Sequence, residues 1–178
     1  MATSQQDAVA LLKADHRKVE DLFEQYEKAR SSDKKSALAK EICTELTVHT
    51  MIEEEIFYPA CRGKVEEDTL DEAYVEHDGA KILIAEIAGS QPGNPFYDAK
   101  VKVLSEEIKH HVKEEERRAE GLFAQAKAAG LDVQALGRKL AARKKELLAQ
   151  IKTTGLPSPE TRSFSGHKVI QGSPAAAA

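Results

Sequence analysis

Four histidines and two glutamates of this sequence have a spacing that favours metal binding. His49 and Glu53 stand four residues apart, and so do His111 and Glu115. On an α-helix this spacing places both side chains on one face, about one turn apart. An imidazole nitrogen and a carboxylate oxygen so placed can chelate one cation, and a carboxylate can also bridge two.

The two His-x3-Glu pairs belong to an internal repeat. His16 precedes His49 by 33 residues, and His77 precedes His111 by 34. The local sequences around the first histidine of each half, DHRKVEDLF and EHDGAKILI, are only weakly similar. Two helical hairpins that each supply a histidine and then a His/Glu pair would meet with pseudo-twofold symmetry. The repeat therefore predicts two metal ions, each bound by two histidines and both bridged by two glutamates.

All six residues lie on apolar stripes of four expected helices. The stripes are Val9, Leu12, His16, Val19, Phe23; Ile42, Leu46, His49, Glu53, Ile56, Ala60; Leu70, Ala73, His77, Ala80, Ile84, Ile87; and Val101, Leu104, Ile108, His111, Glu115. A buried carboxylate is costly unless it is compensated, and no lysine or arginine shares these stripes. A multivalent cation would compensate both carboxylates.

Acidic and basic neighbours of these residues leave alternatives open. His110 and Glu114 have the same spacing as His111 and Glu115, but they align with a more polar stripe, which favours His111 and Glu115. The remaining glutamates next to the expected ligands point off the stripes and are expected to be solvated or to support the ligands. These are Glu54, Glu55, Glu114 and Glu116.

Helical periodicity fills most of the chain and defines the elements that would position these side chains. Helices are expected over about 4–29, 33–58, 66–88 and 95–130, with Pro59 ending the second and a break or bend near Gly121 in the fourth. Strand signals are nearly absent. Four long helices with short loops predict an all-α, up-down-up-down four-helix bundle over residues 1–130.

The C-terminal part of the chain divides into two segments. Residues 131–152 read as an additional amphipathic helix, capped by Asp132, that would cover the bundle or a partner subunit and so allow a homodimer. Residues 153–178 are rich in Pro, Gly and Ser and end in an alanine run. This composition predicts a flexible tail.

Composition excludes several classes of function. The 178 residues carry 26 basic and 30 acidic side chains, a net charge of −4 that gives no sign of nucleic-acid binding. No apolar stretch approaches the roughly 18 residues of a membrane span, so we expect a soluble, cytoplasmic protein. Cys43 and Cys61 fall in one expected helix, about 27 Å apart, which predicts no internal disulfide.

At these residues the sequence resembles the hemerythrin/HHE cation-binding family. The resemblance covers about residues 8–130, where DH, HTMIEEEIFYP, EH and HHVKEEE follow the family's order. It implies a four-helix bundle around two non-haem iron ions, oxo- or hydroxo-bridged, that bind O2 or react with peroxide or nitric oxide. By position it implies ligand roles for His16, His49, Glu53, His77, His111 and Glu115.

Two departures from the family pattern argue against simple, reversible O2 carriage. Oxygen-carrying hemerythrins have a second histidine one turn after the histidine of the third helix, where this chain has Lys81, and a His-x4-Asp spacing in the fourth helix. The missing ligand would be replaced by water, by Glu76 or by a tyrosine such as Tyr58. An exchangeable position suits sensing or reaction, such as catalase-like decomposition of peroxide.

Two other interpretations compete with this one. The first is a metal-binding structural or sensor bundle that carries out no turnover. The second is a ferritin-like di-metal carboxylate protein, which needs Glu-x-x-His on two helices, whereas only Glu107 and His110 fit that spacing here. Imidazole with carboxylate suits iron, zinc, manganese or nickel, so iron is favoured by the family resemblance alone.

Overall fold

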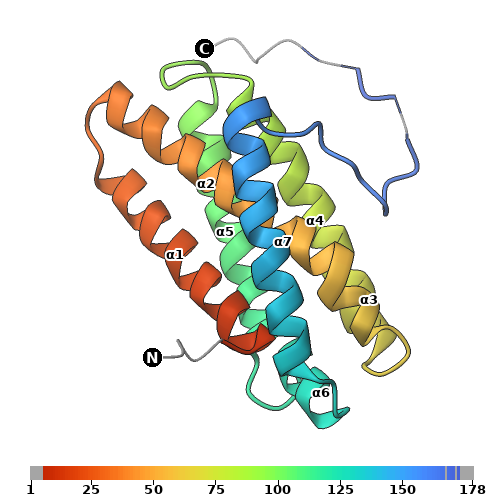
Figure 1. Ribbon diagram of the computed structural model, residues 1–178. Coiled ribbons are helices and arrows are strands. Elements are labelled where there is room, and N and C mark those ends of the chain that lie inside the picture. The colour runs from red at the N-terminus through yellow and green to blue at the C-terminus, as the bar shows by residue number, and fades with distance from the viewer. Residues whose placement is uncertain (1–5, 167, 171, 173–178) are drawn as a thin grey trace, which may run out of the picture.

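The computed structural model describes residues 6–166, 168–170 and 172, and its regular structure over these residues is entirely helical (Figure 1). The predicted all-α class is thus confirmed. In chain order the elements are α1 (Ala8–Lys28), α2 (Ser32–Ile52), the π-helix η1 (Glu53–Phe57), α3 (Tyr58–Cys61), α4 (Glu67–Ala88), α5 (Tyr97–Glu116), α6 (Leu122–Ala128) and α7 (Val133–Thr154).

Two helical hairpins build the bundle. α1 packs on α2, α4 packs on α5, and α2 and α4 join the hairpins. Side-chain caps fix where the first two helices begin, because Asp7 accepts a hydrogen bond from Ala10 N (2.8 Å) and Ser31 accepts one from Lys34 N (3.3 Å). This is the predicted four-helix bundle, with helix bounds close to those expected from periodicity.

The apolar core is divided into two clusters, and the histidines lie between them. Along α1, Leu12 belongs to one cluster and Val19 to the other, with His16 between them. Along α4, Ala73 and Ala80 flank His77 in the same way. The polar residues therefore occupy one layer of the bundle, with an apolar cluster on either side of it along the helices.

The additional helix α7 covers the chain's own bundle. It runs along α1, α2 and η1 (Figure 1), and Leu136, Leu140 and Leu147 of its apolar face are buried in the same cluster as Leu12. This explains the amphipathic pattern of the helix without a second subunit. A homodimer through α7 stays a prediction, and it would have to use the opposite face of the helix.

Gly137 marks the closest approach of α7 to the start of α1. A Cβ atom there would lie 2.5 Å from Gln6 O and 2.8 Å from Ala8 N. We therefore expect Gly137→Ala to destabilise the protein by about 1–3 kcal/mol, although alanine is normally the better helix former. Gly79→Ala, on α4, is the control, because its Cβ would meet only Glu107 Oε2 at 3.9 Å. Urea unfolding should show opposite signs for the two variants, and equal signs would contradict the close approach.

The second helix does not end at Pro59, contrary to the sequence prediction. It passes through the π-helical turn η1, in which the Tyr58 N–H donates to Glu53 O, and continues as α3 to Cys61. The wider turn adds one residue, so that Tyr58 takes the face that residue 57 would have on an α-helix. Ile56, predicted on the buried stripe, is consequently only partly buried, while Tyr58 is completely buried.

The fourth long helix is broken, as expected, but earlier than Gly121. α5 ends at Glu116, directly after Glu115, because Arg117 adopts an extended backbone (φ −51°, ψ 130°). A turn then leads to α6, which supplies Leu122 and Phe123 to the apolar cluster. The break lets α6 fold over the end of the bundle beside the histidine layer.

The tail after α7 carries no regular structure over its described residues. Its first part nevertheless makes specific contacts that the sequence does not predict: Leu156 packs on the apolar core, and residues 160–163 bond to α4. No helix formed by the described residues is long and apolar enough to cross a membrane.

Candidate metal centre

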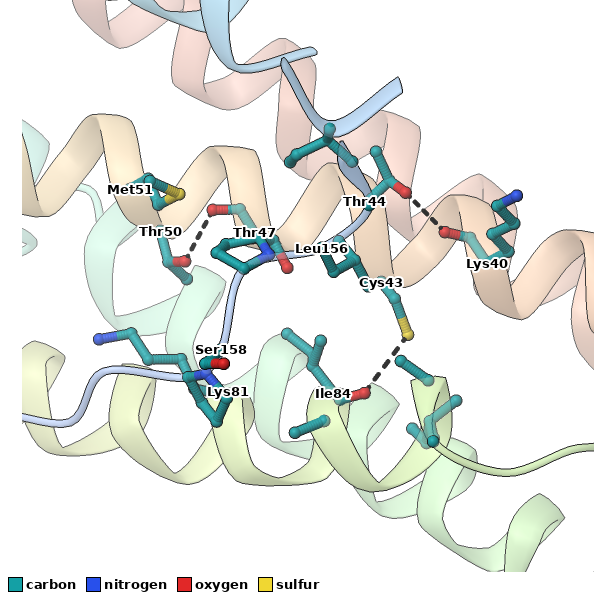
Figure 2. A pocket seen from close by; sticks show the side chains of 18 of the residues that line it. Lys40, Cys43, Thr44, Thr47, Thr50, Met51, Lys81, Ile84, Leu156 and Ser158 are labelled. Carbon is teal, nitrogen blue, oxygen red and sulfur yellow. Dashed lines mark hydrogen bonds between the residues drawn. The ribbon is translucent and has the colours of Figure 1, made fainter. Parts of the chain in front are cut away.

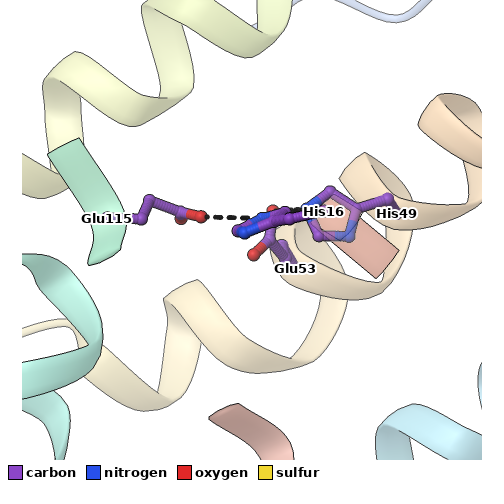
Figure 3. Close-up of side chains that lie close together, drawn as sticks. All are labelled: His16, His49, Glu53 and Glu115. Atoms are coloured by element: carbon purple, nitrogen blue, oxygen red, sulfur yellow. Dashed lines mark hydrogen bonds and ion pairs between the residues drawn. The ribbon is translucent and has the colours of Figure 1, made fainter. Parts of the chain in front are cut away.

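One group of four buried side chains brings potential metal-ligand atoms together from different helices of the bundle. His16 on α1, His49 on α2, Glu53 on η1 and Glu115 on α5 each place an atom within 4.8 Å of the others (Figure 3). The Nε2 atoms of His16 and His49 face each other at 3.1 Å. Glu115 reaches toward the other three from the opposite side of the bundle (Figure 3).

A second group repeats this arrangement on the other hairpin. The Nε2 atoms of His77 and His111 lie 3.2 Å apart, and Glu53 approaches both. The structure thus brings together all six residues expected from the sequence. Each of them is at most 4% exposed.

The two glutamates lie between the histidine pairs. Glu53 Oε2 is 3.1 Å from His49 Nε2 and 3.3 Å from His77 Nε2. Glu115 Oε2 is 3.4 Å from His16 Nε2 and 3.5 Å from His111 Nε2. Each carboxylate therefore reaches one histidine of each pair, which is the geometry the pseudo-twofold repeat predicts for bridging groups.

Unsatisfied polar atoms show that this cluster fits a cation. Glu53 Oε1 and Glu115 Oε2 are buried and accept no hydrogen bond. Buried carboxylate oxygens without partners are expensive, and a cation bound between the histidine pairs would supply the partner that each of these oxygens lacks. Imidazole nitrogens and carboxylate oxygens are together the donors that first-row transition metals use. The residues present thus suit a metal centre in number, type and placement.

Acidic side chains outside the cluster hold the histidine rings. The Nδ1 atoms of three histidines donate to carboxylates: His16 to Glu116 (2.8 Å), His77 to Glu54 (3.1 Å) and His111 to Glu76 (2.7 Å). For the fourth, Asp15 Oδ2 lies 3.7 Å from His49 Nδ1, and Asp15 is held by Lys144 of α7. The three hydrogen-bonded partners fix the tautomers of His16, His77 and His111, so that the Nε2 atom of each is free to bind a metal. His49 Nδ1 makes no hydrogen bond among the described residues.

Glu54 takes one of the two roles expected from the sequence for the residues next to the ligands. It is 7% exposed, not solvated, and it supports His77 as described. Glu116 has the supporting position predicted as one of the two possibilities, whereas Glu55 lies on the surface and pairs with Arg143. Glu114 pairs with Arg117. Only the tertiary structure separates these otherwise similar glutamates.

Tyr58 is a buried polar group at the centre of the cluster. Its hydroxyl donates to Glu115 Oε1 (2.9 Å) and lies 3.1 Å from His77 Nε2 and 3.3 Å from Glu53 Oε2. Burial, together with the charges of Glu115 and Glu53, raises the pKa of Tyr58 well above its ordinary value. Of the two side chains expected to replace the missing histidine, Tyr58 lies inside the cluster, and Glu76 lies behind His111.

Lys81, at the position of the missing histidine, points away from the cluster and holds the tail. Its Nζ pairs with Glu54 Oε1 (2.7 Å) and Asp78 Oδ1 (3.0 Å) and donates to Glu160 O (2.9 Å). Asp78 Oδ2 accepts hydrogen bonds from the backbone N–H groups of Arg162 (2.7 Å) and Ser163 (2.6 Å).

The tail reaches His77 through one further residue. Arg162 Nη1 lies 3.1 Å from Glu54 Oε2, and the other oxygen of Glu54 accepts from His77. Before this point the tail crosses a groove of about 980 Å³ along α2 and α4, where Leu156 and Ser158 lie near Cys43 and Lys81 (Figure 2). Burial raises the pKa of the Cys43 thiol to about 12, so this cysteine is an inert core residue.

The structure distinguishes the two neighbouring histidines of α5. His111 is buried in the cluster, whereas the side chain of His110 is 60% exposed and faces Glu76 from outside. Glu107, the other half of the only Glu-x-x-His pair, is also exposed. A ferritin-like carboxylate site built on that pair therefore has no place in the core.

Metal uptake should release protons from this cluster. Burial opposes the charged form of His49, but the carboxylates of Glu53 and Asp15 outweigh it and raise its pKa to about 10. His49 is then protonated at pH 7 without metal, and a metal needs the neutral ring. We expect at least one proton released per chain on titration with Zn2+ at pH 7, and tighter binding as pH rises toward 10. Calorimetry in buffers of different ionisation enthalpy measures this release, and its absence would contradict the prediction.

The fold and the cluster together define a cation-binding helical bundle. Its motifs match the model of the hemerythrin HHE cation binding domain over residues 7–123, more than half of the chain. The chain belongs to this family, which confirms the resemblance seen in the sequence.

Two proteins are similar to this chain, one in sequence and one in fold. The chain is 30% identical over 106 residues to a DNA nickase from Nostoc sp. strain PCC 7120, a match that covers 60% of this chain but only 30% of that protein. Its fold is similar to the crystal structure of a hemerythrin HHE cation binding domain-containing protein from Mycobacterium kansasii. That comparison gives a TM-score of 0.69 at 23% identity and covers 84% of this chain and 94% of the other.

Proposed function

We propose that this protein is a non-haem di-iron protein of hemerythrin type that binds, senses or detoxifies O2, peroxide or nitric oxide. The observation that carries the proposal is the placement of Glu53 and Glu115, each of which reaches one histidine of each pair. Two ions bridged by these carboxylates would satisfy the buried oxygens that have no partner. Family membership favours iron over the other metals that suit the same donors.

Each ion would have two histidines of its own. His16 and His49 would hold one ion, His77 and His111 the other, and Glu53 and Glu115 would bridge them. Tyr58, whose hydroxyl is 3.1 Å from His77 Nε2, would lie at or next to the position left open by the absent histidine. When bound, the iron pair would supply electrons and an exchangeable position to a small oxidant.

The protein's own residues would control water and protons at this centre. Phe123 stacks on His16 and Phe57 packs against Phe123. Both rings are nearly or completely buried and keep bulk water away from His16. The Tyr58 hydroxyl, held protonated by burial and by the neighbouring carboxylates, donates a hydrogen bond to Glu115 Oε1 and so orients this carboxylate. A hydrogen-bond donor next to an exchangeable position suits reaction with peroxide better than storage of intact O2.

Iron content and peroxide turnover test this proposal together. We expect about two irons per chain after anaerobic reconstitution and catalase-like release of O2 from peroxide, measured per iron, that Glu53→Ala abolishes. His16→Ala and His77→Ala should each lose iron, whereas a carboxylate-rich ferritin-like site would keep it. A reconstituted protein without iron would overturn the proposal.

One observation favours a second candidate, a sensor without turnover. The contact of Arg162 with Glu54, and of Glu54 with His77, links the tail to the metal centre and could report its state to a partner. This candidate predicts iron binding that changes proteolysis of the tail, with no decomposition of peroxide. The nicking activity of the Nostoc relative is not part of either candidate, because the match covers 30% of that protein and the net charge of −4 does not favour nucleic acid.

A further inference from the structure

A surface hollow leads to the metal centre from one side. It has a volume of about 390 Å³ and lies between α4, α5 and the turn before α6. Exposed Glu72 and buried Glu115 both line it, as does His111. The hollow, called here the acidic mouth, therefore connects solvent with two of the six residues of the centre.

The acidic mouth carries a strong excess of negative charge. Its lining includes Glu66, Glu72, Glu76, Glu114, Glu115 and Glu120. Arg117 is the one lysine or arginine among the described residues that line it. A cleft lined by one sign of charge focuses the field and concentrates the opposite ion, raising association rates by about 10–10³. The mouth is thus built to attract cations.

Two side chains that line the mouth, Glu72 and Glu76, and the nearby His110 have the types and spacing of metal ligands. Glu72 and Glu76 stand four residues apart on α4, and His110 of α5 faces them. One atom from each lies within 4.8 Å of the others. His110 Nε2 is 3.3 Å from Glu76 Oε1. An imidazole between two carboxylates suits a divalent first-row metal better than Mg2+ or Ca2+.

Two observations join this group to the centre. Glu76 belongs to both, because Oε1 faces His110 and Oε2 accepts from His111 Nδ1 at 2.7 Å. Glu115, at the inner end of the mouth, is 2% exposed and its Oε2 accepts no hydrogen bond. Glu115 therefore lines the negatively charged opening and also offers an unpartnered oxygen to the centre, where a cation that came through the opening would be bound.

We propose that Glu72, Glu76 and His110 form a third, transient site for a divalent cation, from which ions enter the centre through the acidic mouth. The inference rests on the proposed di-metal centre and adds the route by which it is filled. The outer site exchanges with solvent because its ligands are exposed. The inner site binds more tightly because it offers more ligands and excludes water.

The rate of metal uptake tests this inference. Apoprotein is mixed with Co2+ at low ionic strength, and its d–d absorption is followed by stopped flow. We expect Glu72→Gln/His110→Ala to take up Co2+ roughly tenfold more slowly than wild type, with the same final two ions per chain. Glu86→Gln is the matched control, since Glu86 is exposed at the far end of α4 and pairs with Lys100. Equal rates in wild type and the double variant would overturn the inference.

A second measurement detects the outer site directly. Protein whose centre is already filled should bind one further Co2+ weakly, and the double variant should lose this binding in calorimetry. A filled wild type that binds no further ion would also overturn the inference. If instead the wild type never fills the centre, the proposed function fails, and weak binding that depends on Glu72 and His110 would still show the outer site.

Discussion

Glu53→Gln protein is expected to hold at most one metal ion per chain, where we expect the wild type to hold two. The substitution keeps the shape of the side chain and removes the charge that both histidine pairs share through Oε2. An amide oxygen is a weak, neutral ligand, so the bridge and the charge balance of two cations are lost together. Iron content of the purified, reconstituted variant measures the effect.

The same variant should lose the stabilisation that metal gives to the wild type. A ligand that binds only the folded state raises stability by about 2.7 kcal/mol at 100 times its Kd. We therefore expect added metal to raise the Tm of the wild type and to change that of Glu53→Gln much less. Glu55→Gln is the control, because Glu55 pairs with Arg143 on the surface. An unchanged metal count in Glu53→Gln would remove this residue from the centre.

Glu54→Gln should weaken metal binding about 10–100-fold without abolishing it. Glu54 does not reach the space between the histidine pairs. Its carboxylate accepts a hydrogen bond from His77 Nδ1 and forms ion pairs with Lys81 and Arg162. Its amide analogue would hold the His77 ring less firmly and would make a weaker acceptor. The dissociation rate of metal into an excess of chelator measures the loss.

The tail provides an independent check on the position of Glu54. Removing the Arg162 charge with Arg162→Ala should speed metal release less than Glu54→Gln does, since Lys81 still holds Glu54 at 2.7 Å. Both variants should make the tail more sensitive to limited proteolysis, and Glu55→Gln should change neither property. If Glu54→Gln released metal at the rate of the wild type, Glu54 would not support His77.

Most of the candidate metal centre can be predicted from the sequence, because side chains of a regular helix return to the same face every 3–4 residues. His16, His77 and His111 each stand on a stripe of apolar residues, and a regular helix carries that stripe into the core whatever its neighbours do. The 3-4 spacing also separates His111 from His110, which faces outward. For these positions local periodicity and tertiary structure agree, and the six expected residues meet in one layer.

The π-helical turn η1 is where periodicity fails. Counting in steps of 3.6 residues from Glu53 places Ile56 and Ala60 on the buried stripe, but the extra residue in the turn moves Tyr58 and Cys61 inward instead. Pro59 follows this turn without ending the helix, although a helix end was predicted there from the sequence. Tyr58 could be named as a candidate from the sequence, but its place among Glu115, His77 and Glu53 depends on the irregular turn.

Contacts between distant segments are the part that only the tertiary structure decided. Three glutamates in a row, Glu53 to Glu55, receive three different partners: the histidine pairs, then His77 with the tail, then Arg143 of α7. Their chemistry is identical, and they differ only in the direction that each side chain takes from the π-helical turn η1. The sequence by itself determined the bundle, its histidine layer and the two carboxylates between the histidine pairs, because these follow from helical repeat and burial. Which acidic residues support the histidines, and how the tail reaches them, depends on residues 23 to 100 positions apart that only the packed chain brings together.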